Sequence, residues 1–561
     1  MKKVSLLLSL LFVTIVSICQ DKLSTADWQG DLKFLQQTVH KDYSFLFKKI
    51  SAADFDKEVD QLYKAIPSMK DHEIVAGICR IVSSFKYGHT SLNWMQLPVK
   101  YHIVPVNLYK FSDGLYIEGT DKKYASVVGA KVVKIEGMPV EKAMAAVKPL
   151  SPAENDFYFI AYGLDFLIVP EALHAQKVIK ELKTNITYTL EKDGKTFDQV
   201  FEAVDAFRLP RNYGFSATKN NWVSSRDQSN TPYYLKNLDK IYYYEYIPEQ
   251  KTVYVRHSQI QDDSTEAIPA FYKKVFDFIK NNDVEKLVID VRLNGGGNNY
   301  KNKPIITGII ETAKINKPGK LFVIIGRRTY SACQNLVNEF SNYTNAIFVG
   351  EPTGENINFY GDNRRVELPR SKTPVFLSFA WWQDKPQWEN ADWTAPHIAV
   401  DMSFNDYKTN NDPVLAACFK TGDKDVVLDP FRHLQDLFMQ GKLEQVEKEA
   451  KEIVADPRYR YYSFENKLNE TGYTLMGRNM IKEAMFVFGL NTKLYPSSAN
   501  VWDSFAEVNW KSGNIDKAVE YYNKAIAMDP KGTTGDNARN KLKQIKAGGG
   551  NKTAETHQHD N

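Results

Sequence analysis

The sequence contains few cysteines and none of the short motifs that hold a metal ion. Apart from Cys19 near the start, the chain has only Cys79, Cys333 and Cys418, which are odd in number and widely spaced. This spacing excludes a disulfide framework, and the lack of HExxH and CxxC excludes the common zinc signatures. Cys79 lies in an apolar helical pattern, which predicts a small buried side chain. We therefore expect no metal and no cofactor.

Positive charge does not gather anywhere along the chain. Lys and Arg number 72 against 68 Asp and Glu, and the net charge of +4 is scattered. Proteins that bind nucleic acid usually carry a basic patch, so we expect no nucleic acid partner. Hydrophobic residues at 43% and charged residues at 25% are typical of a globular protein, and 561 residues predict several domains.

Long apolar runs are missing except at the start of the chain. Two lysines precede the run LLLSLLFVTIV, which is too short for a membrane span but suits a secretory signal peptide. Ser17 and Cys19 occupy the small-residue positions of a cleavage site. We predict a signal peptide over residues 1–19 and an exported protein, periplasmic or secreted, without a later membrane span. Lipidation at Cys19 is the alternative, which the bulky Ile18 disfavours.

The spacing of the apolar residues divides residues 20–195 into two regions. Helical spacing, with Ser51 as an N-cap, predicts a helical N-terminal subdomain over 20–100. The spacing then becomes that of strands, with a turn at 112–114 and a strand–turn–helix around Gly137. The latter pattern is similar to part of a PDZ domain, so we predict a small β-rich, PDZ-like region over 101–195.

From about Lys240 strands alternate with helices, within a predicted serine peptidase core over 196–427. The runs TVYVR, KLVIDVR, KLFVIIG and AIFVG are separated by helical patterns, which predicts parallel βαβ units and an α/β fold. In such sheets, sites lie at the carboxyl ends of strands. Gly295–Gly297 follow one predicted strand and Ser331 follows the next.

The C-terminal part repeats with a period of 34 residues. Ala484 and Ala518, Pro496 and Pro530, and Phe488 and Tyr522 are each separated by this interval. The order of small, aromatic and proline landmarks is similar to tetratricopeptide repeats, which we predict over 428–546. Such repeats are expected to hold a protein partner. Residues 547–561, which end in HQHDN, are expected to be a disordered tail rather than a metal site.

Ser331 can be interpreted in two ways from its local sequence. A serine at a strand-to-helix join commonly caps the helix, but the same place suits a nucleophile, which then needs a base. Gly295–Gly297 could form a tight turn, a phosphate loop or a backbone N–H donor. The phosphate loop is disfavoured because the run lacks the Lys-Ser/Thr of a P-loop and the spacing of a dinucleotide fingerprint.

Three segments in order, LVIDVRLNGGGN, GRRTYSAC and AIFVGEPTGENIN, resemble the tail-specific (C-terminal-processing) serine peptidase family and its relative, the tricorn protease core. The resemblance covers roughly 89–416. It implies a crotonase-like catalytic core, with Ser331 as the nucleophile. It also implies an oxyanion hole made by the backbone N–H groups of Gly297 and Ala332.

The same resemblance implies which residue is the base. One branch of the family uses a lysine 25 residues after the serine, where this chain has Asn356, and no lysine occurs between Lys320 and Lys372. The tricorn-like branch uses a histidine and a glutamate, which correspond to His89 in YGHTSL and to Glu389, 58 residues past the serine. Two departures are Tyr87, where an acid is usual, and His397, where an aspartate is usual.

The expected function is that of an exported serine endopeptidase with a Ser331–His89–Glu389 triad and an acyl-enzyme, acting on a protein or peptide. His397, His102 and His257 are rival bases, of which His397 is the best placed because it is close in sequence to Glu389. The alternative is a catalytically idle peptide-binding or scaffold protein of the cell envelope that acts through its repeats.

Overall fold

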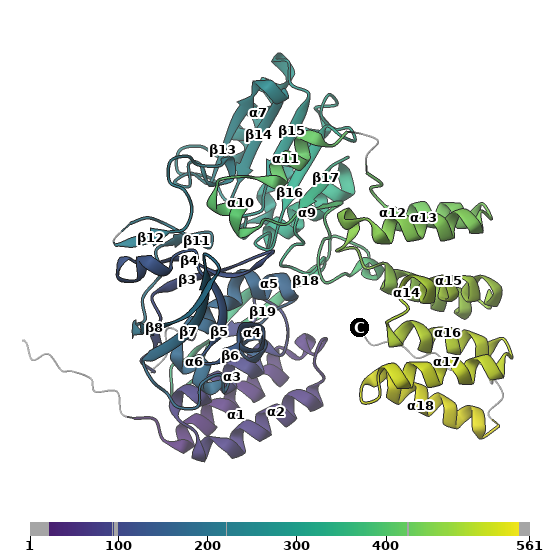
Figure 1. Cartoon of the computed structure of the whole chain (residues 1–561), viewed down its shortest axis with the longest axis horizontal. Helices are drawn as coiled ribbons and strands as arrows, with labels where there is room; N and C mark the ends of the chain where they lie inside the picture. Colours follow the sequence, from purple (N-terminus) through teal and green to yellow (C-terminus); the bar gives the residue numbers. More distant parts are fainter. Residues whose placement is uncertain (1–21, 93, 95–98, 220, 423–425, 549–561) are drawn as a thin grey trace, which may run out of the picture.

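The computed structural model describes residues 22–92, 94, 99–219, 221–422 and 426–548. The predicted signal peptide, Cys19 and the tail from residue 549 onward lie outside the described residues. Across the described ranges, none of the helices has both the length and the apolar character that a bilayer span requires. The chain forms an α/β body with mixed sheets, followed by a helical C-terminal region (Figure 1).

Three helices open the described chain and confirm the predicted helical start. They are α1 (Thr25–Asp42), α2 (Ala52–Ala65) and α3 (Asp71–Ser83). Ser51 caps α2 as predicted, because its side chain accepts a hydrogen bond from the Asp54 backbone N–H. Cys79 is buried on α3, also as predicted. The end of α3 leads directly into the segment that carries His89.

A seven-stranded antiparallel sheet follows. Its order is β12-β4-β5-β7-β8, with β3 beside β4 and β6 beside β5. The strands are β3 (Val106–Phe111), β4 (Gly114–Asp121), β5 (Lys131–Ile135), β6 (Met138–Pro139), β7 (Asn185–Lys192), β8 (Lys195–Glu202) and β12 (Trp222–Ser224). The predicted turns at 112–114 and Gly137 are confirmed, and the short helix after Gly137 is α4 (Val140–Val147). This sheet and α1–α3 contribute to one hydrophobic core.

The second large sheet has six strands in the order β13-β14-β15-β16-β17-β20. They are β13 (Tyr242–Ile247), β14 (Thr252–His257), β15 (Lys286–Asp290), β16 (Leu321–Ile325), β17 (Ile347–Gly350) and β20 (Ile398–Ala399). All neighbours are parallel except β13 and β14, so the predicted parallel units are confirmed.

Helices cover both faces of this sheet. One face packs against α7 (Ile268–Asn281), α8 (Lys303–Ile310) and α9 (Ala332–Tyr343). The other packs against α11 (Pro413–Lys420). Strands β14 to β17 are buried almost throughout, which explains why their sequences are mainly apolar.

A small third sheet ties the N-terminal segment to the rest of the body. Strand β1 (Ser91–Leu92) pairs with β19 (Pro374–Trp382), which pairs with β18 (Phe359–Glu367). The Thr90 and Ser378 hydroxyls add a buried hydrogen bond of 2.7 Å. Because β1 begins at Ser91, just after His89 and Thr90, these contacts hold the segment that carries His89 in place.

The C-terminal region consists of helices stacked one pair after another beside the α/β body (Figure 1). They are α12 (Pro430–Met439), α13 (Leu443–Ala455), α14 (Phe464–Gly477), α15 (Ile481–Leu494), α16 (Ala499–Lys511), α17 (Ile515–Met528) and α18 (Thr533–Lys546). The landmarks Ala484, Phe488, Ala518 and Tyr522 are all buried. The predicted helical character of this region is confirmed.

Candidate active site

Ser331 lies at the junction between β16 and α9. Its backbone torsions, φ 57° and ψ −132°, are ones that a non-glycine residue adopts only at an energetic cost. Although Ser331 stands at the N-cap position, its side chain makes no capping hydrogen bond. Capping therefore does not explain this serine, and the strained turn leaves its hydroxyl available to another group.

The hydroxyl of Ser331 faces the imidazole of His89, although 242 residues separate the two in sequence. The Ser331 Oγ and His89 Nε2 atoms are 3.0 Å apart. The other ring nitrogen, Nδ1, lies 2.7 Å from the Tyr330 hydroxyl, and the His89 ring makes stacked contacts with the rings of Tyr330 and Phe359. If Nε2 accepts the serine proton, Nδ1 carries the ring hydrogen and donates it to Tyr330. The ring is thereby held at both nitrogens and by its stacked neighbours.

The surroundings of His89 favour its neutral form. Burial lowers the pKa of His89, while the charges of Glu154 and Asp362 oppose that shift. Burial also raises the pKa of Tyr330 well above its ordinary value, so the phenol is neutral. A neutral imidazole at hydrogen-bond distance from a serine hydroxyl has the geometry of a general base.

The glycine run after β15 lies against the Ser331 turn. A Cβ placed on Gly296 would lie 2.6 Å from the Ser331 Cβ and 2.9 Å from the Ala332 nitrogen, so only glycine allows this approach. Asn294 holds the run by accepting the Gly296 N–H. Ala332 is the first residue of α9, where a backbone N–H has no partner within the helix.

The Gly297 N–H is the other candidate oxyanion donor. The hydrogen bonds between Ile260 and this run engage the Gly296 carbonyl and the Asn298 N–H, and within the described chain the Gly297 N–H donates to no protein group. Gly297 and Ala332 thus offer two N–H groups on segments that pack against Ser331.

Two buried glutamates accept hydrogen bonds from the backbone of the segments that carry Ser331 and His89. Glu355 accepts the Ser331 N–H at 2.7 Å. Glu154 accepts the Gly88 N–H at 2.8 Å and the Asn356 N–H at 3.1 Å. Burial, followed by the adjacent Glu154, raises the pKa of Glu355 well above its ordinary value and so favours its protonated form.

These two glutamates also approach the imidazole. Ligand-type atoms of His89, Glu154 and Glu355 all lie within 4.8 Å of one another. His89 bonds to Ser331 and Tyr330, and each glutamate accepts a backbone N–H, while the buried Glu355 Oε1 has no hydrogen-bond partner among the described residues.

Glu389 is not brought to His89 in this structure. Its side chain is 48% exposed, and its carboxylate lies 4.0 Å from the Lys385 ammonium. The Nδ1 position that a triad carboxylate would occupy is taken by Tyr330.

The rival histidines have structural partners instead of Ser331. His397 is buried and accepts the Phe348 N–H, which fixes it beside β17. His257 bonds to Tyr272 in the core, and His102 bonds to Glu171.

Sequence reasoning missed Tyr330, Glu154 and Glu355. Tyr330 and Glu355 lie inside the motifs GRRTYSAC and GEPTGEN, and this position in the motifs is the sequence signal that marks them as candidates. Glu154 offers no such signal, because an acid in a Ser-Pro-Ala-Glu-Asn loop is ordinarily solvated. Its burial depends entirely on tertiary packing.

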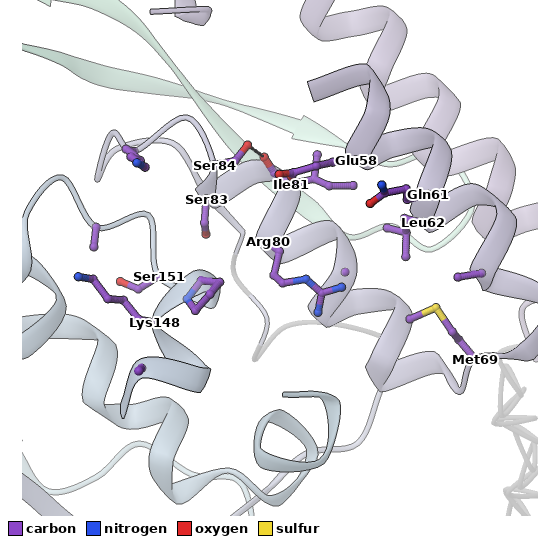
Figure 2. A pocket seen from close by; sticks show the side chains of 16 residues that line it. Glu58, Gln61, Leu62, Met69, Arg80, Ile81, Ser83, Ser84, Lys148 and Ser151 are labelled. Carbon is purple, nitrogen blue, oxygen red and sulfur yellow. Dashed lines mark hydrogen bonds between the residues drawn. The ribbon is translucent and has the colours of Figure 1, made fainter. Parts of the chain in front are cut away.

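A cleft of about 630 Å³ lies between α2, α3 and the segment after α4 (Figure 2). Its lining includes the approach to His89 and the approach to Glu154, namely Ser83, Ser84, Lys86, Ser151 and Ala153. Arg80 and Lys148 add positive charge, and Glu58 adds an acid. Neither Ser331 nor His89 is part of the lining, so the cleft is distinct from the Ser–His pair, although it adjoins the segment that leads to His89.

The fold is similar to that of CPAF. The structure of mature CPAF complexed with lactacystin aligns over 71% of this chain and 97% of its own, with 11% sequence identity and a TM-score of 0.50. The crystal structure of a CPAF point mutant aligns over 72% and 99%, with 10% identity and a TM-score of 0.50. At these identities the likeness establishes a shared fold. Neither a family model nor a curated protein matches the sequence.

Proposed function

We propose that the protein is an exported serine endopeptidase of the tail-specific type, which hydrolyses peptide bonds through Ser331 and His89. The observation that carries this proposal is the 3.0 Å contact between Ser331 Oγ and His89 Nε2, made by a serine that does not cap its helix. The motif order and the CPAF-like fold support the same assignment.

The geometry supports a two-step acyl transfer. His89 Nε2 takes the proton from Ser331 Oγ as the oxygen attacks the scissile carbonyl carbon, and the N–H groups of Gly297 and Ala332 stabilise the oxyanion. His89 then gives the proton to the leaving amine as the carbon–nitrogen bond breaks. Water, activated by the same imidazole, hydrolyses the acyl-enzyme and restores Ser331.

Two sets of residues could orient the His89 ring: Tyr330 with Glu154, or Glu389. The Tyr330 hydroxyl supports the ring hydrogen on Nδ1, and the charge of Glu154 favours the imidazolium that forms during attack. A Ser331–His89–Glu389 triad would require the Glu389 carboxylate to leave Lys385 and displace Tyr330. We therefore assign orientation to Tyr330 and Glu154 and keep Glu389 as the competing hypothesis.

The finer architecture belongs to the same proposal. We assign a PDZ-like character to the β-rich region that starts at 101, a crotonase-like core to the part that ends at 427, and tetratricopeptide repeats to 428–546, following the helical subdomain 20–100. The boundary predicted at 195/196 has to move past β12, because β8 and β12 both belong to the antiparallel sheet. The signal peptide over 1–19 directs export, and the repeats hold a protein partner. The buried landmarks at 34-residue spacing support the repeat assignment.

Active-serine labelling tests the proposal. A fluorophosphonate probe should react with the full-length protein and shift its mass by one adduct, and Ser331→Ala should abolish the adduct while the circular dichroism spectrum stays unchanged. Labelling that persists in Ser331→Ala would overturn the assignment. A folded protein that takes no label would favour the idle peptide-binding or scaffold alternative.

A further inference from the structure

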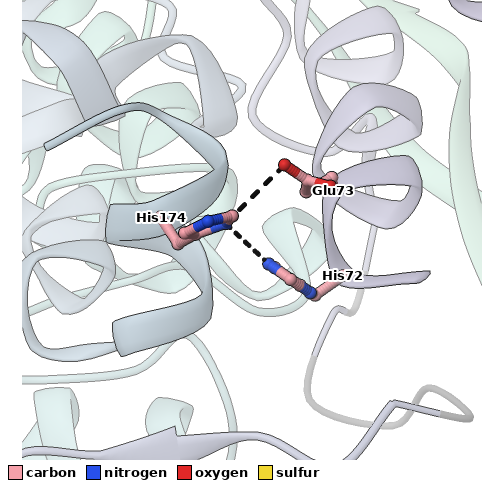
Figure 3. Close-up of side chains that lie close together, drawn as sticks. All are labelled: His72, Glu73 and His174. Carbon is pink, nitrogen blue, oxygen red and sulfur yellow. Dashed lines mark hydrogen bonds and ion pairs between the residues drawn. The ribbon is translucent and has the colours of Figure 1, made fainter. Parts of the chain in front are cut away.

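A second cluster of ligating side chains lies away from Ser331, where α3 meets α6 (Pro170–Ala175). His72 and Glu73 lie in the first turn of α3, and His174 lies on α6. Figure 3 shows the three side chains pointing toward one another from the two helices. The His72 Nε2 and His174 Nδ1 atoms are 3.0 Å apart, and His174 Nδ1 is 3.7 Å from Glu73 Oε1.

We propose that His72, Glu73 and His174 form a binding site for a divalent zinc-class metal ion that fastens α3 to α6. The potential ligand atoms all lie within 4.8 Å of one another. Two ligands that each sit about 2.0–2.1 Å from a tetrahedral zinc ion are roughly 3.3–3.4 Å apart. The two measured separations fall on either side of this value, so an ion fits between the side chains with small rotations.

The chemistry of the donors selects the kind of metal. Two imidazole nitrogens and one carboxylate oxygen suit zinc and its transition-metal neighbours, whereas calcium and magnesium prefer all-oxygen sites. Glu73 is already oriented, because its other oxygen accepts the Lys70 N–H at 2.8 Å and leaves Oε1 facing His174.

The burial of the cluster suits a bound ion with an open side. His72 is 6% exposed, while Glu73 and His174 are partly exposed. The exposed side gives an ion a path inward and leaves room for water as the fourth ligand.

The site joins helices from two regions of the chain. His72 and His174 are 102 residues apart in sequence, which is why no short metal motif reveals the site. The far end of α3 leads to His89, so an ion at the near end would stiffen the helix that delivers the catalytic base. We expect the ion to raise stability more than turnover, since it lies outside the Ser–His pair.

Zinc binding to the chelator-treated full-length protein tests the site. His557 and His559 of the tail are changed to serine in every sample so that they do not contribute. Isothermal titration with Zn²⁺ should give one ion per chain with a Kd of about 1 µM or tighter, and the unfolding midpoint should rise by several degrees. Co²⁺ should give the absorption bands of a tetrahedral site.

Substitutions then locate the binding. His72→Ala and His174→Ala should each remove it, and Glu73→Gln, which keeps an acceptor for Lys70, should weaken it about 10- to 100-fold. His433→Ala is the matched control, because His433 forms an ordinary pair with Glu449 and should leave binding unchanged. Stoichiometric binding that survives both His72→Ala and His174→Ala, or no binding and no rise in midpoint at 100-fold excess Zn²⁺ over protein, would overturn the proposal.

Discussion

The Ser331 site and the C-terminal helices differ in how far apart in sequence their contacting residues lie. The Ser331–His89 contact spans 242 residues, and Glu154 bonds to backbone N–H groups that lie 66 and 202 residues away in sequence. In the C-terminal helices the hydrogen bonds Tyr473–Glu507, Asn537–Asp503 and Lys541–Glu507 each span 34 residues, the period of the sequence repeat. The helices are therefore stabilised by neighbours, whereas the site depends on assembly of the whole body.

The two regions also differ in backbone and polarity. Ser331 has a strained conformation and buried carboxyl groups behind it, which are features that persist only where packing over-determines them. The repeats are regular helices that bury apolar landmarks such as Ala518 and Tyr522. Changes at the site should thus act on turnover, and changes in the repeats should act on local stability.

The largest effect is expected from removing the base. His89→Ala should lower kcat/KM for a peptide substrate by at least about 10⁴-fold, because the Ser331 proton then has no acceptor. Steady-state kinetics on a fluorogenic peptide would measure this, with circular dichroism as the control for folding. Near-normal turnover would refute the pair and make His397 the next base to test.

The pH profile should show the buried setting of that base. His89 must be neutral to act, and burial lowers its pKa below the ordinary value of about 6.5. Activity should therefore stay level near pH 7 and fall about tenfold per pH unit only below the lowered pKa. Measuring kcat/KM between pH 4 and 9 checks this; an acidic limb centred above about 6.5 would mean that a charged neighbour outweighs burial.

The glutamate behind Ser331 should give a smaller effect that depends on the substitute. Glu355→Ala leaves the buried Ser331 N–H without an acceptor, and we expect activity to fall about 10- to 100-fold. Glu355→Gln keeps the acceptor and imitates a protonated acid, so it should stay within about threefold of the wild type. Peptide kinetics and thermal unfolding of both variants test this prediction. An equal loss of activity in both variants would show that Glu355 acts as an anion.

Tyr330→Phe and Glu389→Gln separate the two hypotheses for the orientation of His89. Loss of the Tyr330 hydroxyl removes one hydrogen bond to Nδ1 and should lower kcat by up to about tenfold with little change in KM. Glu389→Gln alters an exposed group beside Lys385 and should change kcat less than twofold or so. The triad hypothesis expects the reverse, with a loss of roughly 10²- to 10⁴-fold for Glu389→Gln.

Some features of the fold and the site can be predicted from the sequence, and others depend on contacts that the sequence does not reveal. The parallel strands were predictable because β14 to β17 are continuous apolar runs between helical patterns, and Ser331 with His89 followed from motifs in a fixed order. Glu389 was predicted from an offset of 58 residues, but an offset does not say where a side chain points. Glu154 and the His72–Glu73–His174 cluster could not be predicted, since each arises from contacts between segments with no shared motif.

The smallest effect on catalysis is expected from shortening the C-terminal helices. The region contacts the α/β body where Arg460 pairs with Asp401 and the Tyr461 carbonyl accepts the Trp393 indole N–H at 3.1 Å, and also where Leu428 packs against the core. Deleting 498–561 removes α16–α18 but keeps these contacts. Cleavage of a short unstructured peptide should change by less than about twofold, because stacked helices depend on their neighbours.

A second deletion sharpens this prediction. Deleting 428–561 also removes Arg460 and Tyr461, which uncovers Trp393 and Phe157, and should lower the unfolding midpoint of the body as well as activity. Peptide kinetics and thermal unfolding of both truncations, beside the full chain, would distinguish a repeat region that serves a partner from one that builds the site. Complete loss of activity in the shorter deletion, with the body still folded, would show that α16–α18 help to form the site.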